Sequence, residues 1–105
     1  MVFAPSNCAA EAGEFLVRVA DATNHPIPTA VAQLVAVGSL QVAPAAGVTD
    51  ESGYARLKVE GAGSYALIVS LEAFRPLVRV VTLGTTRGSC GVVTLEVVGN
   101  ASNAP

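Results

Sequence analysis

Apolar side chains alternate with polar ones in short runs along this chain, and turn residues separate the runs. The run 14–20 places Phe15, Val17 and Val19 on one face and Leu16, with two charged residues, on the other. A period of two residues fits a β-strand with one face in the core and does not fit a helix. The same pattern predicts a second strand at 54–60. Runs rich in Val, Thr, Ile and Tyr between turn residues predict further strands at 30–37, 65–71, 77–83 and 92–98, with short strand pieces at 40–43 and 47–49.

Short strands with a turn about every 8–12 residues are typical of a β-sandwich or a small β-barrel. The 105 residues are enough for one domain with its own hydrophobic core, without help from a metal ion. We therefore predict an all-β domain of seven strands over residues 14–98. An N-terminal arm at 1–13, a candidate assembly strand, precedes it, and a small polar tail at 99–105 follows.

Several segments recur in an order that resembles a known family. They are Val17–Asp21, Pro26–Leu34, the turn Thr49-Asp50-x-x-Gly53, Gly63–Val69 and the pair Ala73-Phe74. In this order they resemble the carboxypeptidase regulatory-like domain, of the prealbumin-like (transthyretin-like) β-sandwiches. The resemblance implies a seven-stranded Greek-key sandwich in an exported protein, acting as a non-catalytic accessory, adhesive or structural module.

The chain departs from that family at two turns. Asn24-His25 stands where the family often has glycine in the first turn, and asparagine adopts the left-handed backbone region more readily than most residues. Ala73 stands where the family usually has glycine before the aromatic residue. Both turns remain compatible with the fold.

The charge balance excludes some classes of partner. Six Lys and Arg against eight Asp and Glu give 6 − 8 = −2, and no basic cluster occurs. Nucleic acids and anionic membranes need a dense cationic surface, so we expect neither as a partner. Turn and polar residues interrupt the uncharged stretch 26–49, so membrane insertion is not expected either. With 51% hydrophobic and 13% charged residues, the chain is more hydrophobic than is usual for a free monomer.

The two cysteines, Cys8 and Cys90, match no metal-binding spacing, and we expect no metal or cofactor. They are either one disulfide or two buried thiols. The composition favours an exported, secreted or cell-surface protein, in which disulfides persist, so we predict the bond. If the first and last strands run side by side and parallel, both sulfur atoms lie at the same end of the sandwich. Asn100, in Asn-Ala-Ser, is a candidate glycosylation site.

No catalytic residue is predicted. His25 has no nucleophile or second histidine at a recognisable spacing, so we interpret it as a solvated turn residue. The 5-hydroxyisourate hydrolases share the expected fold, but Arg18 stands in the first strand where they have a histidine. The stretch 86–89, which resembles their Tyr-Arg-Gly-Ser ending, precedes the last strand here. Lys58 falls on a solvent-facing strand face and does not suit an internal isopeptide bond. The stretch 50–52 fits a turn with a side-chain cap better than a calcium loop.

The most informative feature for function is the expected outer face of two strands. The resemblance implies that Ala30, Ala32 and Leu34 point inward and that the two strands adjoin in one sheet. Val31, Val35, Val37 and Ile68 would then point outward, where a contiguous apolar patch is large for a monomer. The alternative is that outer valines reflect only β-propensity. We predict a self-assembling module, an oligomer or filament subunit, that uses this face together with Val2 and Phe3 of the arm.

A carbohydrate-binding accessory domain of a larger secreted enzyme is the alternative function. Some sandwiches bind glycans through exposed aromatic rings. The chain has no tryptophan, and Tyr54 and Phe74 are the candidate stacking residues.

Overall fold

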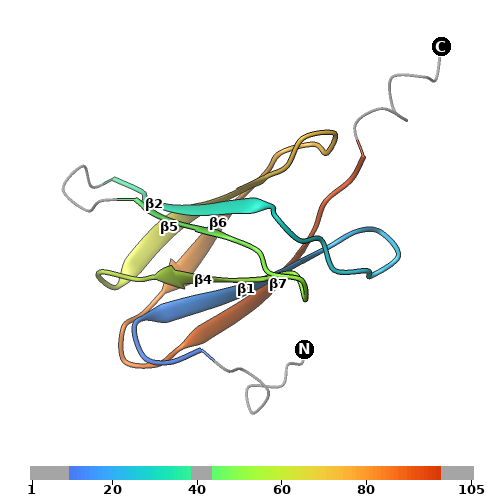
Figure 1. Cartoon of the computed structure of the whole chain (residues 1–105). Coiled ribbons are helices and arrows are strands. Elements are labelled where there is room, and N and C mark those ends of the chain that lie inside the picture. Colours follow the sequence, from blue (N-terminus) through green and yellow to red (C-terminus); the bar gives the residue numbers. More distant parts are fainter. Residues whose placement is uncertain (1–9, 39–43, 98–105) are drawn as a thin grey trace.

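The computed structural model describes residues 10–38 and 44–97 and contains seven strands in two sheets (Figure 1). The predicted all-β class, a seven-stranded sandwich, is confirmed. The strands are β1 (Glu14–Ala20), β2 (Val31–Ala36), β3 (Ala45–Val48), β4 (Tyr54–Lys58), β5 (Gly63–Ser70), β6 (Leu77–Leu83) and β7 (Ser89–Thr94).

The three-stranded sheet has the order β4-β1-β7, and the four-stranded sheet has the order β3-β2-β5-β6. The first and last strands, β1 and β7, pair in parallel, which is the arrangement that a bond between the two cysteines requires. The other pairs are antiparallel. Strands β2 and β5 are neighbours, so the valines of β2 and Ile68 of β5 belong to one surface.

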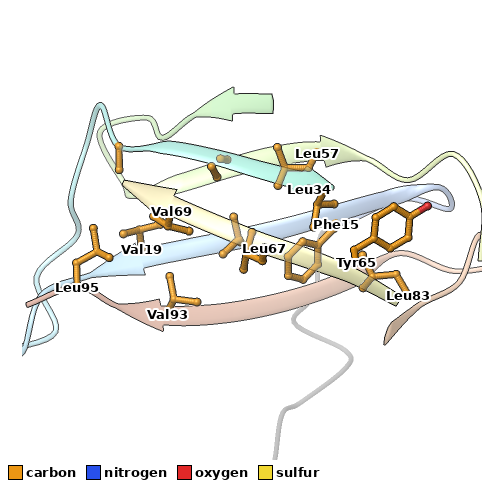
Figure 2. Close-up of a cluster of buried hydrophobic side chains, with 14 of the residues drawn as sticks. Phe15, Val19, Leu34, Leu57, Tyr65, Leu67, Val69, Leu83, Val93 and Leu95 are labelled. Carbon is orange, nitrogen blue, oxygen red and sulfur yellow. The ribbon is translucent and has the colours of Figure 1, made fainter. Parts of the chain in front are cut away.

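The core lies between the two sheets and includes the residues that the alternation at 14–20 placed inward, together with others that it did not place, such as Leu83, Val93 and Leu95 (Figure 2). Phe15 and Val19 of β1 face Leu67 and Val69 of β5 across it. The ring of Tyr65 is buried, and its hydroxyl donates a hydrogen bond to the carbonyl oxygen of Gly61. A polar tip that finds a backbone partner lets a large aromatic ring enter the core without a desolvation penalty.

The structure corrects several details of the predicted strands. Leu16, expected outside with charged neighbours, is buried. It lies in the central strand of its sheet, opposite Arg56 on one side and Cys90 on the other, and these neighbours shield its outer face. Strand β3 is Ala45–Val48 and not 47–49. The predicted piece at 40–43 lies outside the described residues.

Strand β7 runs from Ser89 to Thr94, whereas the apolar pattern predicted 92–98. Parallel pairing with β1 defines its register, with Ser89 opposite Phe15 and Thr94 opposite Ala20. Backbone pairing recruits Ser89 and its neighbours although they lack apolar side chains. Beyond the strand, Val97 forms a single bridge with Phe74.

Both predicted turns have the expected geometry. Asn24 adopts φ 70° and Gly53 adopts φ 83°. The Oδ1 atom of Asp50 accepts hydrogen bonds from the backbone N–H groups of Ser52 and Tyr54, at 2.9 and 3.0 Å. This confirms the side-chain cap that was favoured over a calcium loop.

Ala73, one of the two departures from the family pattern, has φ 76°. The left-handed region costs a non-glycine residue about 1–2 kcal/mol, and the greater freedom of glycine in the unfolded chain offsets part of that. We therefore expect Ala73→Gly to raise the free energy of unfolding by about 0.5–1 kcal/mol. Urea unfolding measures the change. Ala62→Gly, in an exposed loop without positive φ, is the matched control and should be neutral or destabilising. Equal effects of the two substitutions would contradict the strain at Ala73.

Candidate interaction surface

The outer face of the four-stranded sheet is rich in exposed valines. We define this outer face by the side chains of β2, β3, β5 and β6 that point away from the core. Five of the eight exposed large hydrophobic residues of the described chain lie on or beside it: Val31, Val37, Val48, Val78 and Val80. The last two, on β6, are 66% and 65% exposed. Exposure of this kind over four adjacent strands is typical of a contact surface.

The strand register makes the apolar positions continuous. Val31 lies opposite Val48 of β3, and Ile68 lies opposite Val78 of β6. The polar residue Gln33 of β2 lies directly opposite Ile68. The complete outer face in the described strands comprises Val31, Gln33, Val35, Ala46, Val48, Ser64, Ala66, Ile68, Ser70, Val78, Val80 and Thr82.

No charged side chain belongs to the outer face among the strand residues that the structure describes. The one charged residue of the four strands, Arg79, lies between Val78 and Val80 and therefore points to the other side of the sheet. A face without charges loses little hydration when it is covered, so it is suited to contact with an apolar surface.

The structure brings together four of the predicted assembly residues and extends the set. Val31 and Val37 are exposed, while Val35 and Ile68 are half-buried by their neighbours. Val2 and Phe3 lie outside the described residues. Sequence reasoning missed the contribution of β3 and β6. Apolar residues occupy both faces of 77–83, so the alternation did not show which face is inside.

The sandwich edge formed by β6 and β7 differs from the outer face because it carries charged residues. Strands β6 and β7 are the outer strands of their sheets on one side, and a groove of about 600 Å³ lies there. Three of its lining residues are charged, Arg75, Arg79 and Glu96. The lining is completed by Pro76, Leu77, Val78, Val92 and Thr94.

The two candidate glycan-stacking residues differ in environment. Tyr54 is exposed on β4 of the three-stranded sheet. Phe74 is partly buried and packs against the core, and it pairs with Val97. Of the two rings, Tyr54 is therefore the one that is open to a sugar.

The residues considered for catalysis are engaged in local structure. His25 is exposed, and its Nδ1 atom lies 2.6 Å from the hydroxyl oxygen of Thr23 in the same turn. Arg18 donates hydrogen bonds to the side chain and the backbone carbonyl of Asn24. Lys58 is exposed and lies 4.0 Å from Glu60, so it stands on a solvated face as expected. Within the described ranges, no group of three His, Cys, Asp or Glu residues could hold a metal ion.

Cys90 lies in β7, opposite Leu16 of β1. Its predicted partner, Cys8, lies outside the described residues, so the disulfide stays a prediction. One contact supports it: a side chain at Gly88 would collide with the backbone of Ala10. The two chain segments therefore approach each other within two residues of each cysteine. Asn100 also lies outside the described residues.

Two half-buried carboxylates make folding pH-dependent. Hydrogen bonds from the Thr23 hydroxyl and from the backbone N–H of His25 hold the pKa of Asp21 below its ordinary value of 3.8. A hydrogen bond from the backbone N–H of Glu11, together with Arg56, lowers the pKa of Glu14 below 4.5. A lowered pKa in the folded state means that the stabilisation is complete above the ordinary value and is lost as the pH falls through the lowered one.

We therefore expect these two groups to have no effect on the melting temperature while the pH is above their ordinary pKa values, 4.5 and 3.8. As the pH drops below those values, the melting temperature should fall. Calorimetry across this range measures it. Asp21→Asn keeps an acceptor oxygen but does not titrate, so the melting temperature of this variant should fall less at acidic pH. If the melting temperature of that variant falls as steeply at acidic pH as that of the unmodified chain, the role of Asp21 is contradicted.

Comparison with known proteins places the domain among small β-sandwiches. Over 84% of this chain, the Bacillus anthracis TIE protein superposes with a TM-score of 0.66 and 15% identity. A 3-chlorocatechol 1,2-dioxygenase from Rhodococcus opacus 1CP superposes over 93%, with a TM-score of 0.67 and 10% identity. A type II cohesin–X-dockerin complex from Acetivibrio cellulolyticus gives a TM-score of 0.50 and 19% identity over 78% of the chain.

These likenesses show the fold alone. The chain spans 17%, 64% and 56% of those three chains, respectively. No family model matches the sequence, and no curated protein matches it. In the part of the chain that the structure describes, no helix is long and apolar enough to cross a membrane.

Proposed function

We propose that this domain is a non-catalytic, secreted or cell-surface interaction module, and that its outer face packs against the same face of a second copy. The observation that carries the proposal is the uncharged outer face with its exposed valines. The strand order is compatible with the prealbumin-like sandwiches, and we extend the resemblance to the carboxypeptidase regulatory-like domain as part of this proposal.

A second copy suits the outer face better than a charged partner does. Charged partners are selected by charges of opposite sign, and the described strands offer none on this face. A neutral face also meets itself without like-charge repulsion. Each of the exposed valines, once covered, contributes on the order of 1.5–3 kcal/mol at most.

The size of the face predicts weak association. Four strands about 4.8 Å apart, each with about six residues of 3.3 Å, present roughly 300–400 Å². A stable interface buries about 800 Å² on each partner. Association costs about 4–15 kcal/mol in lost freedom, so the face alone supports a dimer that forms only at high concentration. We propose that the N-terminal arm, with Val2 and Phe3, supplies the additional contact.

Sedimentation velocity from about 10 μM to 1 mM tests the proposal. The unmodified chain should associate as the concentration rises, and Val80→Lys should remain monomeric. Val92→Lys is the matched control, because Val92 is 61% exposed but belongs to β7 in the other sheet. It should associate like the unmodified chain. Circular dichroism establishes that all three proteins are folded.

A chain without residues 1–6 should associate less strongly than the full chain if the arm contributes. An unmodified chain that stays monomeric at the highest concentration would refute self-assembly. The carbohydrate-binding alternative, with Tyr54 as its exposed ring, would then be the function to test on glycan arrays.

A further inference from the structure

We propose that β6 is the docking site for an extended acidic peptide segment, which adds to the four-stranded sheet as a fifth strand beside the groove. This site goes beyond the outer face, and its occupant is a different one. Three features of the described residues support it. They are a free strand edge, two arginines without an ionic partner, and the alternation of Arg79 with Val78 and Val80, which matches a peptide of alternating acidic and apolar residues.

The free edge follows from the hydrogen bonds within the sheet. The N–H of Val37 donates to the carbonyl oxygen of Ser64 at 2.9 Å, so the even-numbered residues of β5 direct their backbone groups toward β2. In an antiparallel ladder this direction alternates, so the odd-numbered residues of β5 bond to β6. Their partners on β6 are also odd-numbered, such as Arg79 opposite Leu67.

The even-numbered residues Val78, Val80 and Thr82 therefore direct their N–H and C=O groups toward the open edge. A row of unpaired backbone groups is a template for another strand. Strand addition of this kind gains its affinity from main-chain hydrogen bonds and its selectivity from alternate side chains.

The charges along the edge select the occupant. Arg75 and Arg79 both line the groove, and neither forms an ion pair within the described residues. Glu96 is the one acidic residue among the lining residues, so the groove is positive although the chain as a whole carries a charge of −2. Guanidinium groups pair well with carboxylates, often through two hydrogen bonds at once.

The same charges disfavour a second copy at this edge. Antiparallel pairing of two β6 strands would bring Arg79 of both copies into neighbouring positions, and a charge on an edge strand is a common means of preventing such pairing. An acidic strand avoids this repulsion. Its carboxylate would lie opposite Arg79 on the groove side, and apolar side chains on either side would lie next to Val78 and Val80.

The predicted ligand is therefore an extended segment in which acidic and apolar residues alternate. A fluorescent peptide of the sequence Thr-Val-Glu-Val-Glu-Val-Thr is the probe, and a peptide with glutamine in place of glutamate is its uncharged match. Fluorescence anisotropy at low ionic strength, with the domain at concentrations where it is monomeric, measures binding. We expect the glutamate peptide to bind about tenfold more tightly than the glutamine peptide.

Two protein variants and one modified peptide separate the contributions. Arg79→Glu should weaken binding of the glutamate peptide about tenfold, while Lys58→Glu, an equal change of charge on β4, should leave it within about twofold. The glutamate peptide with N-methylated valines cannot donate main-chain hydrogen bonds, so its binding should also fall about tenfold or more.

Equal binding of the glutamate and glutamine peptides, or of Arg79→Glu and Lys58→Glu, would overturn the acidic selectivity. Undiminished binding of the N-methylated peptide would overturn strand addition. Absence of binding by the glutamate peptide would overturn the site altogether. None of these results bears on association through the outer face, which sedimentation of the unmodified chain measures separately.

Discussion

Thr49→Val is expected to lower the free energy of unfolding by about 3 kcal/mol, because it leaves a buried donor and a buried acceptor without partners. Thr49 is 4% exposed. Its hydroxyl accepts a hydrogen bond from the N–H of Ala30 at 2.9 Å and donates one to the carbonyl oxygen of Ile27 at 2.7 Å. The side chain thereby connects the segment before β2 to the turn before β4. Valine has nearly the same shape but offers neither bond.

Urea unfolding measures this loss. Thr49→Ser keeps the hydroxyl and loses one buried methyl group, so it should cost only about 1 kcal/mol. If the serine variant is as unstable as the valine variant, packing and not hydrogen bonding explains the importance of Thr49.

Gly53→Ala is expected to destabilise the domain by about 3 kcal/mol or more, for two reasons that add. Gly53 has φ 83°, a region that costs alanine about 1–2 kcal/mol. A Cβ atom there would also lie 2.6 Å from the carbonyl oxygen of Val19 and 3.0 Å from Cβ of Pro26. The backbone would have to move, and with it the 2.7 Å hydrogen bond from the N–H of Val19 to the carbonyl oxygen of Gly53.

Gly61→Ala is the matched control, because a Cβ atom at Gly61 meets nothing within 4 Å. It should be neutral or stabilising by up to about 1 kcal/mol. Similar urea midpoints for the two variants would show that the turn at Gly53 adapts, and would contradict the close approach to Val19.

The outer face and the groove depend on the same strand in different ways. Val80 presents its side chain to the outer face and its backbone to the free edge, whereas Arg79 presents its side chain to the groove. Arg79→Glu should therefore weaken strand addition at the edge and leave the outer face unchanged, whereas Val80→Lys alters the outer face and also a side chain beside the added strand.

Local sequence determined the strands and the inner face. The alternation at 14–20 predicted one shared face for Phe15, Val17 and Val19, and all three lie in the core. Where one face of a strand is apolar and the other is polar, only one orientation buries the apolar side chains, so the pattern is sufficient. The turns at Asn24 and Gly53 were also predictable, because few residues accept their backbone angles.

Pairing between distant strands decided the rest. Leu16 is buried because β4 and β7 flank it, and β7 begins at Ser89 because its backbone pairs with β1. Strand β6 has apolar residues on both faces, so its sequence could not show that Val78 and Val80 are exposed and that Arg79 lines a groove. Its orientation depends on its register with β5, a contact between segments whose local sequences carry no information about each other. The sequence by itself therefore determined the fold class and most of the inner face, because these follow from local alternation. The tertiary structure decided the burial of Leu16, the bounds of β7 and the exposure of β6, because these depend on pairing between distant strands.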